Sequence, residues 1–416
     1  MAVLATELAF GPPRDWPLAF DLAEYHERGR RVRAEMQRVG LDMLYVTSPP
    51  NITYLTGYDS RWYRRSTSTG VALHAASDRV IFFDDITHRT LVSAHHAQVG
   101  EAAFFRRFRD VERDGWIFRN SADDVVDTLR KEGWLRGSAG LEHWSTAPGG
   151  IPLRYIDERM TGAGARTIDG SWLVDRVRLV KSPAEIARLD RAAVIADAAL
   201  VAIAQDFQPG MSEIEVQGIA HYAMSRLDGE EPAIRTSVIS GPNTRVQHPL
   251  PTRRKIGKGD LFTVDLCGSF YRYHANIART FSAGEPDPRW RDLVTRAAVS
   301  FDHVLAAVRP GDPMEKAAEV AMQYLDSAGL TRYGWFIGGY DLGIAIPPDW
   351  VGHTYLNGRC FERADFTVGT VVNFENVLDV PEDWPGGFGT QNVDTLVMEE
   401  GGLRILSRLD RGITIV

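Results

Sequence analysis

The stretch HPLPTRRKIGKGDLFTVDLCGSFYRYHANIART, residues 248–280, decides the fold of this 416-residue chain. Apolar and β-branched residues dominate two runs in and beside it, 261–267 and 271–281. These runs predict two neighbouring strands, and similar runs follow at 370–375 and 393–398. Because each group of β-rich runs follows a predicted helix, we expect an antiparallel sheet flanked by helices.

A diverged repeat surrounds this stretch. Pro209-Gly210 precedes a predicted helix that starts at Ser212, and Pro310-Gly311 precedes a predicted helix that starts at Pro313. The two Pro-Gly pairs lie 101 residues apart, and β-rich sequence follows each unit. This spacing predicts two related halves.

The N-terminal part of the chain has a different pattern. Helical stretches alternate with short apolar runs at 41–47, 71–76 and 80–83, which predicts a small α/β domain. A second domain is expected, since single cores stop growing at roughly 250 to 300 residues.

The domain boundary is marked by the start of a long helix. Ser182, Pro183 and Glu185 form a capping box with proline at the first helical position, and the predicted helix reaches about residue 205. We predict domains of residues 1–174 and 175–416.

The composition excludes several classes of function. The net charge is −8 with scattered Lys and Arg, so no basic patch is available for nucleic acid. No apolar run approaches the ~20 residues of a membrane span, and the first 14 residues lack the pattern of a signal peptide. The two cysteines, Cys267 and Cys360, cannot build a zinc cluster or a disulfide framework. We expect a cytoplasmic protein with neither nucleic acid nor a membrane as partner.

The polar residues of the opening stretch carry a family resemblance. They comprise a histidine, a Gly-Asp turn, an acidic strand residue 17 positions after the histidine, and an Arg-Thr pair on the next strand: His248, Gly259-Asp260, Asp265 and Arg279-Thr280. This order resembles the pita-bread superfamily (peptidase family M24), which includes methionine aminopeptidases, prolidases, creatinase and ectoine hydrolase. The segment NITYLTG (51–57) and Lys181-Ser182 also fit, so the resemblance covers the whole chain. It implies an α/β (α+β) fold, with a small N-terminal α/β domain and a C-terminal pita-bread domain that contains a pseudo-twofold repeat.

The same resemblance allows a test for metal ligands. Metal-dependent members hold two ions with two aspartates 11 residues apart, one histidine and two glutamates. Asp265 and Glu375 keep two of these five positions, whereas Asn276 and Tyr340 replace an aspartate and the histidine. The last glutamate falls near 391–393, where no carboxylate is present. Amide and phenol are poor substitutes for carboxylate and imidazole, so we expect no metal and no other cofactor.

Creatinase and ectoine hydrolase, which act without a metal, indicate the substrate class. The runs at 271–275 and 347–350 look more like ectoine hydrolase, and creatinase has a glutamate at the position of Ala278. Ectoine hydrolase usually carries glutamate at the position of Asp265. The resemblance therefore implies a metal-independent hydrolase of a C–N bond in a small zwitterionic or cationic metabolite.

Three residues could perform this hydrolysis. An amidine or guanidinium carbon requires a nucleophile or base and an acid for the departing nitrogen. His248 could supply the acid because its ordinary pKa is near neutrality. Asp265 could attack or orient the cationic substrate, and Glu375 could activate water.

Further residues are expected to contact the substrate. The predicted contacts in the C-terminal domain are His274, Asn276, Tyr340, His353 and Asn392. Cys267 should share a strand face with Asp265, because strand side chains alternate with a period of two.

An aromatic and cationic segment in the N-terminal domain completes the predicted site. Its residues Arg61, Trp62, Tyr63 and Arg64 could hold a carboxylate and close over a flat cation. In creatinase-like dimers the equivalent loop reaches into the partner's site. The resemblance thus implies a homodimer in which this loop completes the neighbouring site.

Three other functions remain open. The first is an Xaa-Pro-type metallopeptidase with an unusual site. The second is a lyase on the same fold that acts on a dimethylsulfoniopropionate-type substrate. The third is a binding protein without catalytic activity.

Overall fold

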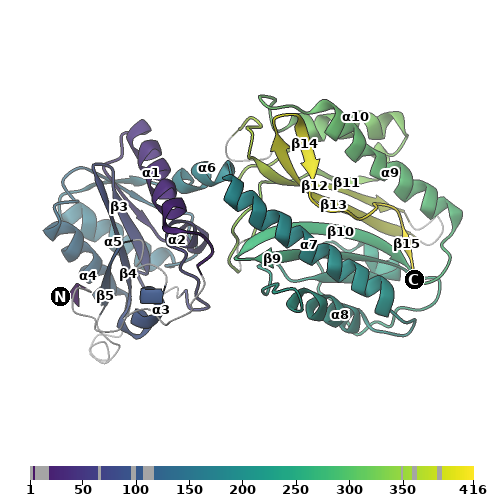
Figure 1. Cartoon of the computed structure of the whole chain (residues 1–416), viewed down its shortest axis with the longest axis horizontal. Helices are drawn as coiled ribbons and strands as arrows, with labels where there is room; N and C mark the ends of the chain where they lie inside the picture. The colour runs from purple at the N-terminus through teal and green to yellow at the C-terminus, as the bar shows by residue number, and fades with distance from the viewer. Residues whose placement is uncertain are drawn as a thin grey trace. The chain divides into compact units, whose positions relative to one another are not determined.

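The computed structural model of the chain has two compact units, Met1–Arg178 and Leu179–Val416 (Figure 1). It describes residues 3–4, 18–63, 67–94, 100–105, 117–347, 350–357, 363–381 and 387–416. Both units combine helices with a sheet, which confirms the expected mixed α/β architecture. None of the described helices is long and apolar enough to cross a membrane.

The N-terminal unit, as far as it is described, is built on a seven-stranded sheet with the strand order β1-β5-β4-β3-β2-β6-β7. The strands are β1 (Val3–Leu4), β2 (Met43–Val46), β3 (Gly70–His74), β4 (Ser77–Asp85), β5 (Glu101–Phe105), β6 (Ser138–Leu141) and β7 (Arg166–Asp169). The helices are α1 (Leu22–Arg38), α2 (Pro49–Thr56), α3 (Arg89–Ala94), α4 (Ile117–Lys131), α5 (Gly150–Gly162) and α6 (Leu173–Leu179). The apolar runs predicted as strands form β2, β3 and β4.

The NITYLTG segment forms most of α2, and a buried carboxylate holds the start of this helix. Glu142 accepts hydrogen bonds from the backbone N–H groups of Thr47 and Ser48, each at 2.6 Å, and from the side chain of Asn51 at 2.7 Å. The carboxylate thereby provides partners for buried backbone and side-chain donors at the entry to the helix. The segment therefore has a structural role.

The C-terminal unit contains one sheet, and its described strands follow the order β11-β12-β13-β10-β9-β8, with β14 beside β13 and β15 beside β10. The strands are β8 (Ser237–Ser240), β9 (Leu261–Phe270), β10 (Tyr273–Ser282), β11 (Gly334–Gly338), β12 (Val371–Val380), β13 (Phe388–Glu399), β14 (Gly402–Ile405) and β15 (Thr414–Ile415). The helices are α7 (Pro183–Asp206), α8 (Glu213–Ser225), α9 (Pro288–Ala307) and α10 (Lys316–Ser327). The capping box predicted at Ser182 is present, with both of its hydrogen bonds.

Equivalent hydrogen bonds reveal the pseudo-twofold repeat. The N–H of Gly210 donates to the carbonyl of Ile256 at 2.7 Å, and the N–H of Gly311 donates to that of Phe366 at 2.7 Å. Both glycines have a positive φ, near 100° and 90° respectively, where a side chain would strain the backbone. The predicted repeat is thus confirmed.

The second repeat helix begins later than predicted. We placed its start at Pro313, but α10 begins at Lys316. The N–H of Met314 donates instead to the carbonyl of Ala364, so this turn pairs with a distant segment of the chain before the helix starts.

Helices α7 and α9 lie against one face of the sheet, here called the helix face (Figure 1). Strand β9 approaches α7 so closely that a Cβ added to Gly268 would lie 2.0 Å from the carbonyl oxygen of Ala192. On β12, Phe374 packs edge-on against Phe301 of α9. Residues one position away, such as Cys267 and Glu375, point to the opposite face, here called the site face.

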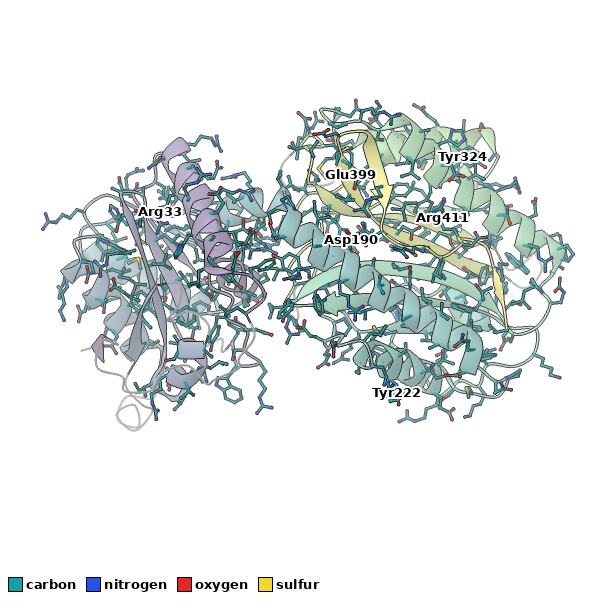
Figure 2. All side chains as sticks on the ribbon, in the orientation of Figure 1. Arg33, Asp190, Tyr222, Tyr324, Glu399 and Arg411 are labelled. Carbon is teal, nitrogen blue, oxygen red and sulfur yellow. The ribbon has the colours of Figure 1, made fainter. Side chains whose placement is uncertain are left out.

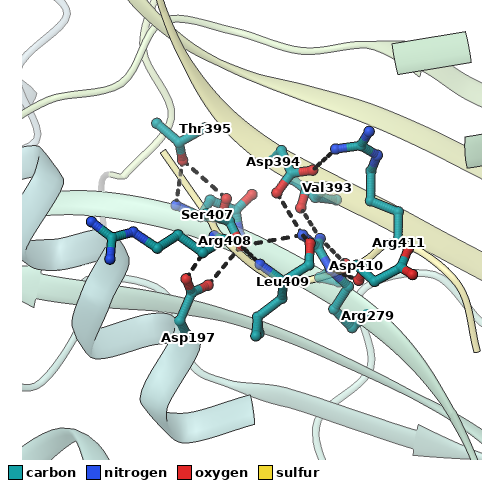
Figure 3. A network of polar contacts seen from close by, with 12 residues as sticks. Asp197, Arg279, Val393, Asp394, Thr395, Ser407, Arg408, Leu409, Asp410 and Arg411 are labelled. Carbon is teal, nitrogen blue, oxygen red and sulfur yellow. Dashed lines mark hydrogen bonds and ion pairs between the residues drawn. The ribbon is translucent and has the colours of Figure 1, made fainter. Parts of the chain in front are cut away.

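A buried ion-pair network lies on the helix face (Figure 3). Arg279 of β10 donates to the carboxylate of Asp394 of β13 at 2.8 Å, and neither side chain is more than 2% exposed. Arg279 also donates to the carbonyls of Leu409 and Asp410, and Arg411 lies 3.5 Å from the second carboxylate oxygen of Asp394. The network ties the last turn of the chain to the central strands.

Replacing Arg279 by leucine should lower the free energy of unfolding by about 3 to 5 kcal/mol, because the Asp394 carboxylate stays buried with much of its compensation removed. Chemical denaturation would measure the change. Arg404→Leu is a matched control, since Arg404 pairs at the surface with Asp190 and Glu399 and should contribute at most about 1 kcal/mol. Figure 2 labels these two acidic residues. Equal losses in the two variants would contradict the prediction.

Candidate functional site

The two predicted catalytic carboxylates lie in one row across the site face. Ala278 of β10 pairs with Asp265 of β9 on one side and with Val393 of β13 on the other. Val393 in turn pairs with Glu375 of β12. Directly paired residues point to the same face of a sheet, so both carboxylates face the same space.

Two asparagine amides connect the carboxylates. The Nδ2 of Asn276 donates to Asp265 at 2.8 Å, and the Nδ2 of Asn373 donates to Glu375 at 2.6 Å. Asn373 also donates to the Oδ1 of Asn276 at 3.2 Å. The backbone N–H of Tyr340 donates to the Oδ1 of Asn373 at 2.8 Å, and the Tyr340 hydroxyl bonds to Glu375. We call these five residues the carboxylate–amide array.

Desolvation raises the pKa of both carboxyl groups above the ordinary values. It raises the pKa of Asp265 to about 6, opposed by the hydrogen bond from Asn276 and by the charge of His248. It raises the pKa of Glu375 to about 7, with a further increase from the negative charge of Asp265 and opposition from Tyr340 and Asn373. Both groups therefore change charge near neutral pH, as groups at functional sites often do.

His248 lies on a segment whose two ends bind the same carboxylate. Buried Glu213 at the start of α8 accepts hydrogen bonds from the N–H and hydroxyl of Ser240 and from the N–H and hydroxyl of Thr252, all at 2.7–2.8 Å. Arg245 forms an ion pair with Asp379 of β12.

The conformation of His248 fits a functional segment better than a relaxed loop. Its backbone φ is 56°, a value that residues other than glycine rarely adopt. The imidazole is exposed and meets the ring of Trp335 edge-on, with the ring centroids 5.9 Å apart.

Two predicted substrate contacts are placed differently from expectation. Asn392 pairs with Asn376 and therefore points to the helix face, where Asn376 donates to Ser300 of α9. This prediction was wrong because the strand register places Gln391 and Val393, on either side of Asn392, on the site face.

His274 is buried with both ring nitrogens bonded to backbone. Its Nε2 accepts from the N–H of Ala233 at 2.9 Å, and its Nδ1 donates to the carbonyl of Arg272 at 2.8 Å. Burial lowers its pKa to about 4, so the ring is neutral at pH 7. In this arrangement the ring has no nitrogen left for a substrate.

Two further residues of the predicted site are Cys267 and His353. Cys267 pairs with Asn276 and lies on the site face, and burial raises the pKa of its thiol well above the ordinary value. His353 lies beside Thr354, which donates to Asp341, and its contact with substrate stays a prediction.

The predicted N-terminal contacts belong to the other unit. Arg61 and Trp62 are exposed, the hydroxyl of Tyr63 donates to the carbonyl of Tyr58 at 3.3 Å, and Arg64 lies outside the described residues. Their part in binding stays a prediction.

The structure adds Asn373 and Glu213 to the residues that shape the site. Asn373 could have been found from the sequence, because it lies two positions before Glu375 on the same strand face. Glu213 gives no such signal, since its partners Ser240 and Thr252 are 27 and 39 residues away.

The array does not fit a pair of divalent ions. Asp265 and Glu375 accept hydrogen bonds from amide N–H groups, whereas such ions require free oxygen ligands. On β13 the position opposite Glu375 is held by Val393, which offers no ligand. Within the described residues, no group of three or more His, Cys, Asp or Glu could hold a metal ion.

The chain belongs to metallopeptidase family M24. The model of that family matches residues 187–405, and the creatinase/prolidase N-terminal domain matches residues 28–180. The ectoine hydrolase of Halomonas elongata is 25% identical over 432 residues, which cover 95% of this chain and 98% of that protein. The creatinase of Bacillus sp. (strain B-0618) is 25% identical over 411 residues, which cover 94% and 92%.

A solved structure shares the fold. The Xaa-Pro dipeptidase from Bacillus anthracis matches with a TM-score of 0.76 and 20% identity, covering 94% of this chain and 100% of that one. The three relatives are hydrolases named for different substrates, so membership leaves the substrate of this chain open.

The raised pKa of Glu375 predicts how stability depends on pH. The folded state binds this proton more tightly than the unfolded chain, so stability falls as the pH rises from about 4.5 to about 7. Glu375→Gln removes the ionisation while it can keep the hydrogen bonds. We expect no gain in the free energy of unfolding at pH 4 and a gain of about 1 to 2 kcal/mol at pH 8, after allowance for partial exposure.

Denaturation at the two pH values would measure this gain. Glu215→Gln is the control, because Lys255 and Ser212 lower the pKa of Glu215 to about 2 and its loss should give no gain at pH 8. A gain at pH 4 as large as at pH 8 in Glu375→Gln would show that ionisation is not the cause.

Proposed function

We propose that the protein is a metal-independent hydrolase of a C–N bond in a small zwitterionic or cationic metabolite of the ectoine, creatine or amidine type. The carboxylate–amide array carries the proposal. It places two carboxylates in one row and satisfies them with amide N–H donors. The similarity to ectoine hydrolase and creatinase over more than nine-tenths of the chain supports this substrate class.

The electrostatics of the array suit a cationic substrate. Two half-buried carboxyl groups with pKa values of about 6 and 7 resist full ionisation, because desolvation and mutual repulsion disfavour the second negative charge. A cation bound between them lowers both pKa values and completes their ionisation. Binding of the substrate therefore prepares the charge state that hydrolysis requires.

The residues then divide the reaction. Ionised Glu375 accepts a proton from water, whose oxygen adds to the amidine or guanidinium carbon. The C–N bond breaks, and the departing nitrogen takes a proton from His248. Asp265 orients the cation in this route. In the alternative route the Asp265 carboxylate attacks the carbon, the C–N bond breaks, and the departing nitrogen takes a proton from His248. The ester-like intermediate that remains is then hydrolysed by water.

A homodimer would complete the site. Arg61, Trp62 and Tyr63 offer a guanidinium and two aromatic rings on a partly exposed segment, which can bind a carboxylate and cover a flat cation. We propose that this segment, together with Arg64, serves the site of the partner subunit.

Turnover assays with metal analysis would test the proposal. Purified protein should contain no stoichiometric divalent metal and should release product from a C–N substrate such as ectoine or creatine equally well with and without a chelator. The competing reading is an Xaa-Pro metallopeptidase, which the shared fold makes the strongest alternative. Stoichiometric metal with chelator-sensitive cleavage of an Xaa-Pro dipeptide would establish that alternative.

Asp265→Asn distinguishes the two routes. If Asp265 is the nucleophile, turnover should fall to background while the melting temperature and substrate binding change little. If Asp265 only orients the cation, the variant should keep measurable turnover with a raised KM. Steady-state kinetics and calorimetric titration would separate these results.

A further inference from the structure

A second row of polar side chains lies beside the row of Asp265 and Glu375. Thr263 of β9 pairs with Thr280 of β10, two residues from the pair of Asp265 and Ala278. Gln391 of β13 lies two residues from Val393 in the same direction, because β10 and β13 run antiparallel. All three therefore point to the site face, one step of about 7 Å from the carboxylate row.

The polar atoms of this second row lack partners. The hydroxyls of Thr263 and Thr280 and the Oε1 of Gln391 are buried without a hydrogen bond. Gln391 is 8% exposed, so a small part of its side chain remains accessible, whereas the threonines are closed off at 1% and 0%. Gln391 is thus the member of the row that a ligand could reach.

Along β13, Gln391 lies between the segment that carries His248 and the row that contains Asp265 and Glu375. One pair further along β13, Gly389 lies under the segment that carries His248, and the N–H of Gly389 donates to the hydroxyl of Thr244 at 3.1 Å. A Cβ at Gly389 would lie 2.1 Å from the carbonyl oxygen of Thr244, so this close crossing requires glycine. In the opposite direction along β13 comes Val393, the partner of Glu375.

The segment adds a second amide to this region. Gln247, next to His248, has a buried Nε2 without a hydrogen bond. More than nine in ten buried polar groups in proteins are hydrogen-bonded, because an unpaired one destabilises the fold. A ligand that donates to Gln391 and accepts from Gln247 would supply the hydrogen bonds that these two amides lack.

We propose that Gln391 is a specificity-determining residue, whose side-chain amide binds an uncharged hydrogen-bonding group of the substrate such as an amide. The inference rests on the proposed function, in which Asp265 and Glu375 meet the cationic C–N group. A primary amide carries both a donor and an acceptor and no charge, so it can pair with a neutral group and leave no charge uncompensated. The substrate therefore carries that neutral group in addition to its cationic carbon.

Gln391→Met tests the proposal with a side chain of similar size that cannot form these hydrogen bonds. Hydroxyectoine serves as the probe, because it adds one uncharged hydroxyl to ectoine, and ectoine is the comparison whose KM should not change. We expect KM for hydroxyectoine to rise about three- to tenfold, the equivalent of one neutral hydrogen bond, while kcat changes by less than about twofold. The melting temperature should stay equal or rise, because an unpaired buried amide has been removed.

Thr390→Val is the matched control. Thr390 is the neighbouring residue on β13, and its hydroxyl is also buried and unpaired, but it points to the helix face. Its replacement should leave KM and kcat unchanged and should not lower the melting temperature. An unchanged KM in Gln391→Met, or an equal rise in both variants, would overturn the proposal.

The melting temperature separates failure of this inference from failure of the proposed function. If the wild type turns over neither ectoine nor creatine, the proposed function fails, but the melting comparison still applies. A melting temperature of Gln391→Met several degrees below that of Thr390→Val would show that Gln391 has a structural partner and would overturn the inference. An equal or higher value supports an amide kept free for a ligand.

Discussion

The alternation of side chains along β9, β10, β12 and β13 is the constraint on which the rest of the C-terminal unit depends. Each strand must direct one set of side chains to the helices and the other set to the site face. Arg279 and Ala278 are adjacent, yet the first joins a buried ion pair and the second separates two carboxylates. A shift of register by one residue would exchange these sets and destroy both the core and the site.

This constraint explains what could be predicted from the sequence. Asp265 and Glu375 interrupt apolar strand segments and fit two positions of the family motif, so the resemblance predicted that they belong to one site. The strand register adds that they share one face of the sheet. The assignment of Asn392 as a substrate contact was wrong because the sequence alone does not give the strand register. It required the register of β13 against β12, which depends on where the preceding connection ends, and the composition of the strand does not determine that point.

Long-range polar contacts set the other limit. Nothing near His248 in the sequence indicates that the carboxylate of Glu213 fastens both ends of its segment. His274 was predicted as a substrate contact because it lies on the strand pair near Asp265. Its two nitrogens instead bind the backbone at Ala233 and Arg272, and a contact 41 residues away is invisible to local pattern.

The site face departs from the rules that govern the helix face, and the departures are related. On the helix face, Asp394 is fully buried but has Arg279 and Arg411 as partners. On the site face, Asp265 and Glu375 receive only amides and a phenol, and Gln391 receives no partner. Groups that destabilise the empty protein lose this penalty when a ligand supplies the missing charge and hydrogen bonds, so the same deficits become binding energy. The deficits in this chain are positive charge beside the carboxylates and a neutral donor or acceptor beside Gln391. A molecule that carries a cationic C–N group and an adjacent uncharged polar group satisfies both at once, which a simple cation or a simple amide cannot do.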